Sequence, residues 1–175
     1  MVRTAVRRRE GAARIISPRV EPSTFDETQF FRAVHESGAQ ALLIGRRALV
    51  FLGLPVLTAD YDFWLASDDI EAFNRTAAVF DLHPSHPPDQ ARQRGRYVLE
   101  NDEHIDVLVA RSLTTVDGQL VTFEAIWKRR QAVALDDVSV SVPSLDDLIL
   151  TKQVATRAKD LEDIRLLRIL KEERR

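Results

Sequence analysis

Two stretches of the chain alternate apolar and polar residues, which is the pattern of β-strands buried on one face. In ADYDFWLA (59–66), Asp60 and Asp62 lie on one face, and Tyr61, Phe63 and Leu65 lie on the other. In EHIDVLVA (103–110), Asp106 lies on the polar face, opposite a row of Ile and Val residues. Asp is a poor strand former, so the carboxylates in these strands need an explanation.

Three other segments are predicted to form strands. AQALLIG (39–45) has the composition of a short buried strand, and RYVLEN (96–101) is expected to form a hairpin with EHIDVLVA (103–110) through an Asn-Asp turn. VALDDVSVSV (133–142) is expected to form strands on either side of an Asp-Asp turn. The chain therefore holds enough strands for a sheet.

Apolar residues spaced three and four apart predict six helices. They cover residues 25–38, 46–53, 68–80, 123–131, 144–157 and 159–175. Thr24 is expected to open a capping box for the first helix, Ser67 to cap the third, and Leu161 in the last to point toward the core. The segment 81–95, rich in Pro and His, is predicted to be a loop.

These helices and strands mix without strict βαβ repetition. That order predicts an α+β fold, a mixed β-sheet with packed helices and a C-terminal helical cap. A chain of 175 residues is long enough for one domain with a substantial hydrophobic core. We expect a single domain over residues 24–175, preceded by a basic, flexible arm over residues 1–23.

Composition indicates the class of protein. Hydrophobic residues make up 45% and charged residues 30% of the chain, as in soluble globular proteins. Cys is absent, which excludes disulfides and thiolate metal sites. The longest apolar run, 48–57, is too short to span a bilayer, and the N-terminus lacks the apolar segment of a secretory signal. We therefore expect a cytoplasmic protein with no membrane partner.

Charge is distributed unevenly along the chain. The first twenty residues hold six Arg and one Glu, whereas the rest of the chain holds 19 basic and 26 acidic residues. This acidic remainder is not suited to binding a nucleic-acid backbone by itself. The basic arm could bind one, or it could be a disordered leader.

The acidic residues of the two alternating strands suggest a metal site. If these strands are neighbours, Asp60, Asp62 and Asp106 can converge on one face of the sheet. Oxygen ligands without Cys favour Mg²⁺ or Mn²⁺, and two such ions can hold the attacking and leaving oxygens of a phosphoryl transfer. The alternative is that each Asp ends its strand and faces water.

The order of four motifs resembles the DNA polymerase beta-like nucleotidyltransferase superfamily. Three of them are a strand ending in Gly before a short helix, LLIGRRALVFLG; a strand with D-x-D, LTADYDFWLA; and a later strand with Asp, EHIDVLVA. The fourth, VPSLDDLILTKQVATRAKDLEDIRLL, resembles the C-terminal part of small bacterial members such as abortive-infection toxin-type nucleotidyltransferases. The resemblance covers roughly residues 39–170.

This resemblance implies metal-dependent transfer of a nucleoside monophosphate from an NTP to a hydroxyl, with release of pyrophosphate. Three carboxylates would be catalytic and would hold Mg²⁺ or Mn²⁺: Asp60, Asp62 and Asp106. Four residues would bind the nucleotide: Gly45, Arg46, Lys152 and Asp160. Asp160, and also Asp163, could orient Lys152 or contact the nucleotide. The acceptor could be RNA such as tRNA, a protein or a small molecule, and a toxin-type member would have an antitoxin partner.

One position departs from the pattern of the family. The Gly-Gly or Gly-Ser pair of the family is Gly45-Arg46 here. Arg46 either binds phosphate itself or fills the pocket. If it fills the pocket, the rival function is a catalytically inactive interaction module on the same fold. Lys152 has its own alternative, that of an ordinary exposed helix residue.

Overall fold

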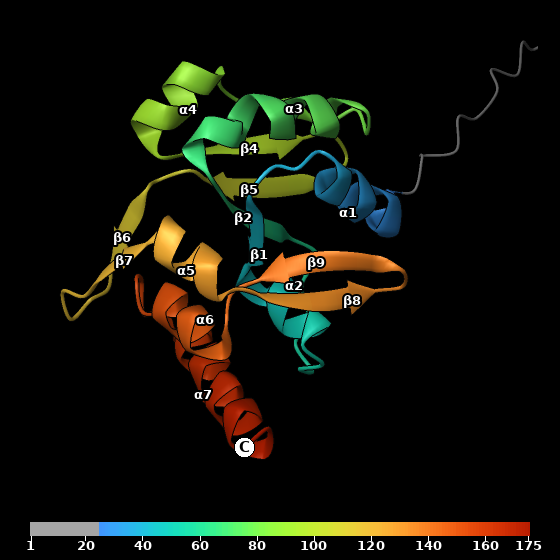
Figure 1. Cartoon of the computed structure of the whole chain (residues 1–175). Helices are drawn as coiled ribbons and strands as arrows, with labels where there is room; N and C mark the ends of the chain where they lie inside the picture. Colours follow the sequence, from blue (N-terminus) through green and yellow to red (C-terminus); the bar gives the residue numbers. More distant parts are fainter. Residues whose placement is uncertain (1–24) are drawn as a thin grey trace, which may run out of the picture.

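A mixed five-stranded sheet lies at the centre of the molecule, with the strand order β1-β2-β5-β4-β3 (Figure 1). Its strands are β1 (Ala41–Ile44), β2 (Tyr61–Leu65), β3 (His83–Pro84), β4 (Arg96–Glu100) and β5 (His104–Leu108). The structure, a computed structural model, describes residues 25–175, and the arm predicted over residues 1–23 lies outside them.

The sheet pairs the two strands that carry the carboxylates. β2 runs parallel to β5, whereas β1 and β2, β4 and β5, and β3 and β4 pair antiparallel. The predicted hairpin of β4 and β5 is confirmed. The α+β architecture with a mixed sheet is confirmed as well, because parallel and antiparallel pairs share one sheet.

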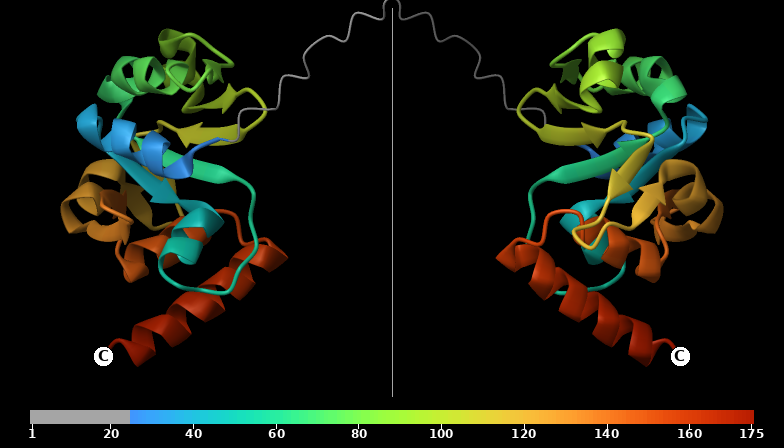
Figure 2. Two further views of the ribbon diagram at one scale, coloured as in Figure 1. Left: turned by 90° about the vertical axis from the view of Figure 1, so that its right-hand side faces the viewer. Right: turned by 90° about the vertical axis from the view of Figure 1, so that its left-hand side faces the viewer.

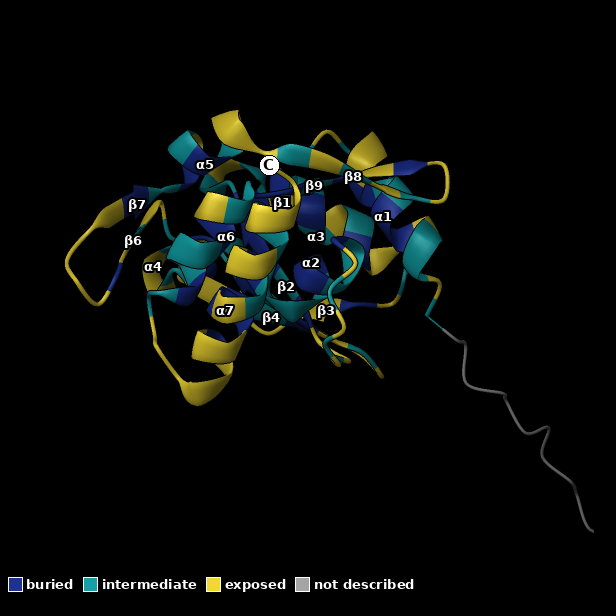
Figure 3. Cartoon of the chain, turned by 90° about the horizontal axis from the view of Figure 1, so that it is seen from below, coloured by how far each residue is buried: buried dark blue, intermediate teal, exposed yellow. Residues whose placement is uncertain are grey.

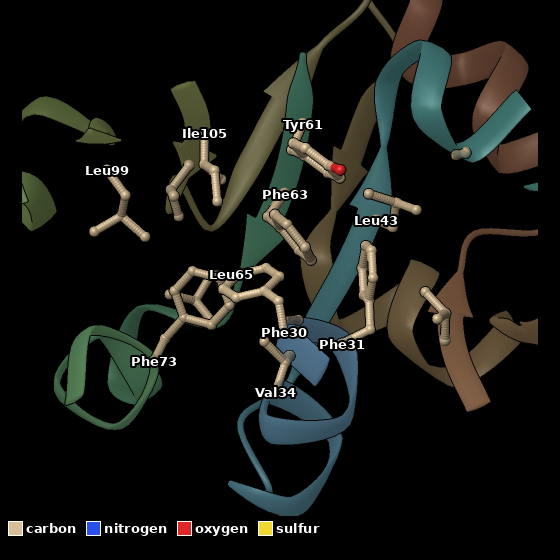
Figure 4. Packing of buried hydrophobic residues seen from close by; sticks show 14 of the residues in the cluster. Phe30, Phe31, Val34, Leu43, Tyr61, Phe63, Leu65, Phe73, Leu99 and Ile105 are labelled. Atoms are coloured by element: carbon tan, nitrogen blue, oxygen red, sulfur yellow. The ribbon is translucent and has the colours of Figure 1, made fainter. Parts of the chain in front are cut away.

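One face of the sheet carries the main hydrophobic core. Helices α1 (Glu27–Glu36) and α3 (Ile70–Ala78) pack on this face. Phe30 from α1, Phe63 from β2 and Phe73 from α3 are almost fully buried, and their ring centroids lie 5.3–6.4 Å apart (Figure 4). The alternation along β2 therefore buries Tyr61, Phe63 and Leu65 here and directs Asp62 to the other face.

The opposite face of the sheet carries a second, smaller core. Leu42 of β1 and Trp64 of β2 pack there against Val121, Phe123 and Ile126. These partners come from the hairpin of β6 (Ser112–Thr114) and β7 (Leu120–Thr122) and from α5 (Phe123–Arg129). Asp62 and Asp106 lie on this same face, so the second core borders the site.

Several further elements pack near β1, at one edge of the sheet. They are α2 (Gly45–Phe51), the hairpin of β8 (Gln131–Leu135) and β9 (Val138–Val142), α6 (Leu145–Lys152) and α7 (Ala158–Glu173). Ser144 caps α6 by accepting a hydrogen bond from the backbone N–H of Asp147. α7 packs against α6 and extends past the rest of the fold (Figure 2), which confirms the C-terminal helical cap.

Two expectations about local structure were wrong, and one hairpin was not predicted. The segment 81–95 is not only a loop, because it contains β3 and α4 (Pro88–Arg94). Proline suits the first turn of a helix, where its missing N–H is not needed, and Gly95 ends α4 with φ +73°. The unpredicted hairpin is formed by β6 and β7. Leu161 points outward, with 56% of its surface exposed.

The caps of two helices also differ from the prediction. Asp26 caps α1 by accepting a hydrogen bond from the N–H of Gln29, whereas Thr24 lies outside the described residues. Ser67 begins a 3₁₀ turn (Ser67–Asp69) before α3 and makes no capping hydrogen bond to it. Within residues 25–175, no helix has the length and apolar character needed to cross a membrane.

Candidate functional site

Asp62 and Asp106 lie directly opposite one another on neighbouring strands. The parallel register of β2 and β5 pairs Asp62 with Asp106. Paired residues on adjacent strands project from the same face and are about 4.8 Å apart along the hydrogen-bonding direction. Two of the three predicted carboxylates are therefore brought together. Asp60 precedes β2 and is exposed.

The electrostatic surroundings of Asp62 favour a cation. Burial is the largest effect that raises the pKa of Asp62, followed by the charge of Asp106, while Lys152 acts in the opposite direction. Asp60 raises this pKa further, so its charge also acts on the pair. Among residues 25–175, none donates a side-chain hydrogen bond to Asp62 or forms an ion pair with it. A partly buried carboxylate that lies near other carboxylates and has no side-chain partner is stabilised by a positive charge.

Asp106 has two basic neighbours that the sequence analysis did not select. The guanidinium of Arg96 lies 3.2 Å from Oδ1 of Asp106, and Nε2 of His104 lies 3.5 Å from Oδ2. The predicted β4–β5 hairpin could have identified Arg96, because it places Arg96 diagonally across from Asp106. Arg96 belongs to β4, which lies on the side of β5 away from Asp62, whereas His104 belongs to β5 itself.

Gly45 lies against the carboxylate of Asp62. It follows β1 and begins α2, and β1 pairs Ile44 with Asp62. Its φ is +66°, and a Cβ atom built on it would lie 2.1 Å from Oδ2 of Asp62. A residue with a side chain would therefore be strained here and would also displace the carboxylate. The strand-ending glycine that the motif requires has a steric role at the site.

Gly45→Ala is expected to lower the activity that depends on Asp62 by about 100-fold, the usual cost of misplacing a catalytic group by about 1 Å. Gly53→Ala is the matched control, because Gly53 has φ +88° and no atom within 4 Å of its added Cβ. Both variants should lose about 1–2 kcal/mol of stability from left-handed strain. Thermal unfolding measures the backbone strain in both variants, and a transfer assay measures the effect of displacing the Asp62 carboxylate. Equal activities of the two variants would contradict a role for the close contact between Gly45 and Asp62.

Lys152 is buried and not an ordinary surface residue. Its relative exposure is 9%, and its Nζ donates to Oδ2 of Asp163 at 2.7 Å. Asp160 is more distant from Nζ, at 3.8 Å, and instead accepts a hydrogen bond from the backbone N–H of Arg157 at the start of α7. Asp163, which is completely buried, is therefore the residue that orients Lys152.

Arg46 extends from α2 toward α7. Its guanidinium lies 3.1 Å from Oδ1 of Asp163 and 3.0 Å from Glu162. The hydrogen bond to Asp163 is the largest effect that raises the pKa of Arg46. Asp163 is thus shared by Lys152 and Arg46, and this three-residue network joins α2, α6 and α7 next to the carboxylate pair.

Comparison with solved structures shows which fold this chain has. The solution structure of the antibiotic-resistance factor ANT(2'')-Ia is similar with a TM-score of 0.57 and 15% identity, over 80% of this chain and 79% of that one. The lincomycin-bound lincosamide antibiotic adenylyltransferase LnuA has a TM-score of 0.57 and 12% identity, over 83% of this chain and 98% of that one. The chain has a nucleotidyltransferase fold.

A third structure agrees with these two. ANT(2'')-Ia in complex with adenylyl-2''-tobramycin has a TM-score of 0.56 and 16% identity, over 80% of this chain and 84% of that one. No protein-family model and no curated protein sequence matches the chain. The nucleotidyltransferase fold is therefore shown by structure, and the activity of this chain has to be argued from its own residues.

The donor set suits Mg²⁺ bound together with a nucleotide. No group of three or more His, Asp or Glu side chains in residues 25–175 is arranged to hold a metal ion by itself. Mg²⁺, however, is usually bound by one or two carboxylates together with water and substrate phosphates. Asp62 and Asp106 supply such a pair, and the pKa of Asp62 is raised by burial and then by the negative charge of Asp106, both of which a bound cation would offset. These residues fit a metal–nucleotide complex better than a free ion.

Proposed function

We propose that this chain is a metal-dependent nucleotidyltransferase that moves a nucleoside monophosphate from an NTP to a hydroxyl. The observation that carries the proposal is the Asp62–Asp106 pair in parallel register, with Gly45 packed against it. The nucleotidyltransferase fold, established by geometry alone, agrees with this assignment. The reaction uses NTP, so we also propose a cytoplasmic location.

Each residue of the site has a defined role in this reaction. Asp62, Asp106 and Asp60 hold Mg²⁺ or Mn²⁺, which on binding offsets the negative charge of the phosphates. Asp106 accepts the proton of the acceptor hydroxyl as its oxygen attacks the α-phosphorus. The bond from the α-phosphorus to the bridging oxygen breaks, and pyrophosphate leaves with the electron pair. Gly45 leaves room for the triphosphate beside Asp62.

The C-terminal residues of the site act on the nucleotide. Lys152 supplies a positive charge that acts on Asp62, and we assign it to the triphosphate. Asp163 holds the Lys152 ammonium at 2.7 Å. Asp160 caps the start of α7 and lies 3.8 Å from the Lys152 ammonium, so it helps to orient this side chain. Arg46 can reach a phosphate only by leaving Asp163 and Glu162, to which it is bound here.

The similar structures suggest a class of acceptor. Two of the similar structures contain small antibiotics, as adenylyl-2''-tobramycin in ANT(2'')-Ia and as lincomycin in LnuA. A small molecule with free hydroxyls is therefore the first acceptor class to test, followed by RNA such as tRNA and by protein. Transfer to RNA or protein would suit a toxin with an antitoxin partner.

One observation favours the inactive module as a second candidate. Arg46 replaces the small residue of the family motif, and both of its carboxylate partners belong to α7. An arginine tied to α7 in this way could close the nucleotide pocket. Arg46→Ser separates the two functions: a closed pocket predicts that Arg46→Ser binds NTP and that wild type does not.

The test is incubation of the full chain with Mg²⁺ and each NTP labelled at the α-phosphate. Small polyhydroxylated antibiotics, total RNA and protein extract serve as three separate acceptors. The proposal predicts transfer of the label to one acceptor class in wild type, and none in Asp62→Asn. Transfer that persists in Asp62→Asn would place the chemistry elsewhere, and no transfer to any acceptor, combined with no NTP binding, would favour the inactive module.

A further inference from the structure

Lys159, in the first turn of α7, has no ionic partner among the residues that the structure describes. The chain has four lysines. The other three each pair with a carboxylate: Lys128 with Glu124, Lys152 with Asp163 and Lys171 with Asp146. Lys159 is exposed and makes neither an ion pair nor a side-chain hydrogen bond within residues 25–175. Its ammonium is therefore available to bind another group.

The partner that the spacing of Lys159 predicts is already occupied. Lys159 and Asp163 are four residues apart on α7, a spacing that favours an ion pair along a helix. Asp163 instead pairs with Lys152 at 2.7 Å and with Arg46 at 3.1 Å, and its side chain is fully buried. Lys159 is thus a positive charge in excess, beside a network whose own cations are held.

The face of α7 that carries Lys159 points to the nucleotide site. Residues three and four apart share a helix face, so Lys159 shares one with Glu162 and Asp163. Both of these carboxylates contact Arg46 of α2, the residue that follows Gly45. Long side chains in a helix point back toward its N-terminus, which places the Lys159 ammonium near the start of α7. Figure 3 shows α2 and α6 beside this helix.

The electrostatics of the carboxylate pair agree with this placement. Burial and the charge of Asp106 raise the pKa of Asp62, whereas the charges of Lys152 and Lys159 lower it. Lys159 therefore acts on the same carboxylate as Lys152, although it belongs to a different helix. The triphosphate of a nucleotide bound beside Asp62 would lie within reach of the same positive charge.

The other cations near the start of α7 are matched by carboxylates. Three basic residues pair there with three acidic ones: Arg46 with Glu162 and Asp163, Lys152 with Asp163, and Arg157 with Asp160. A triphosphate has to compete with these carboxylates for their cations. Lys159 can bind it without breaking an ion pair, and lysine is a common ligand of phosphate groups.

We propose that Lys159 is a further nucleotide-binding residue, which binds the β- and γ-phosphates of the NTP from the start of α7. This inference rests on the proposed function and adds a second cation to the one assigned there, Lys152. In this arrangement Arg46 stays bound to Asp163 and Glu162, so the network that joins α2 to α7 remains intact when the nucleotide binds.

Calorimetry with the full chain, Mg²⁺ and a non-hydrolysable analogue of each NTP tests this proposal. Lys159→Ala should weaken binding of the preferred analogue about tenfold or more, the effect of losing one charge-assisted hydrogen bond. It should weaken binding of the corresponding NMP much less, because an NMP has no β- or γ-phosphate. Lys159→Arg should keep most of the affinity. Salt at about 0.15 M screens charges more than about 8 Å apart, so the loss then reports a close contact.

Binding of Mn²⁺ alone gives a second readout. Lys159→Ala removes a positive charge near a cation site, so it should bind Mn²⁺ at least as tightly as wild type does while it binds the NTP more weakly. Damage to the carboxylate pair would weaken both. Weaker binding of Mn²⁺ alone in Lys159→Ala would therefore contradict a direct role in binding phosphate.

Arg165→Ala is the matched control for the loss of charge. Arg165 is exposed on the same helix, forms no ion pair within residues 25–175, and lies on the outer side of α7 with Leu161 and Ile169. This variant should bind the NTP as wild type does. If wild type binds the NTP and Lys159→Ala binds it equally well, or Arg165→Ala is weakened as much, the role of Lys159 is refuted and the proposed function stands. A wild type that binds no NTP would overturn the proposed function, and the role of Lys159 with it.

Discussion

Asp62→Asn is expected to remove nucleotidyl transfer and, in the absence of divalent metal, to make the fold more stable at neutral pH. Asp62 is a partly buried carboxylate, and metal ions contribute several kcal/mol of charge stabilisation in such reactions. Loss of this contribution corresponds to a decrease in rate of at least about a thousand-fold. Asn has a similar volume but no charge, so it removes the electrostatic cost of the Asp62–Asp106 pair along with the metal ligand.

The stability effect has a definite pH dependence. Burial, followed by the charge of Asp106, raises the pKa of Asp62 in the folded state. Its pKa in the unfolded state is about 3.9. The folded state therefore binds the proton more tightly, and the free energy of unfolding falls as the pH rises through the window between the two pKa values. Urea unfolding in EDTA should show wild type losing stability relative to Asp62→Asn as the pH rises above about 4, the value in the unfolded state.

Asp68→Asn is the matched control for this prediction. Asp68 follows the same strand but its side chain is 87% exposed, so its substitution should change neither activity nor the pH dependence. Full activity of Asp62→Asn would remove Asp62 from the site. If wild type instead gains stability relative to Asp62→Asn as the pH rises, the raised pKa of Asp62 in the folded state would be contradicted.

Asp163→Ala is expected to destabilise the fold by about 3–5 kcal/mol, the usual cost of removing one partner from a buried ion pair. The Asp163 side chain has 0% exposure, and it pairs with Lys152 at 2.7 Å and with Arg46 at 3.1 Å. Its removal leaves the Lys152 ammonium, 10% exposed, with only the more distant Asp160. Urea unfolding measures the change in the free energy of unfolding.

Glu162→Ala is the control for this network. Glu162 pairs with the same Arg46, but its side chain is 66% exposed, so its loss should cost less than about 1 kcal/mol. Replacing both charges, with Lys152→Met and Asp163→Leu together, should recover part of the stability lost in Asp163→Ala. A cost for Asp163→Ala no larger than that for Glu162→Ala would contradict the buried network.

The centre of the fold could be predicted because strand alternation is a local property. The period of two in β2 and β5 placed Asp62 and Asp106 on polar faces, and the Asn-Asp turn predicted the β4–β5 hairpin. The register that puts Asp62 directly beside Asp106 could not be predicted, since it depends on a parallel pairing of strands about forty residues apart. The sequence suggested convergence of three carboxylates, and the fold pairs two of them.

Contacts between helices that are distant along the chain could not be predicted from the sequence. Asp160 and Asp163 are one turn apart and share a face of α7, so spacing alone could not decide which one holds Lys152. The partners of Arg46 were equally hidden, because Asp163 is more than a hundred positions away along the chain. In 81–95, the high Pro content suggested a loop, although Pro at the first turn of a helix is a start signal.

The most direct test of the central claim is a crystal of the full chain grown with Mn²⁺ and a non-hydrolysable NTP, measured at a wavelength where Mn scatters anomalously. The account predicts an anomalous peak between Asp62 and Asp106, about 2.1 Å from an oxygen of each, as expected for a Mg²⁺-like ion, with the triphosphate next to Gly45. A nucleotide bound with its metal elsewhere, or an empty Asp62–Asp106 pair at saturating Mn²⁺ and NTP, would contradict it.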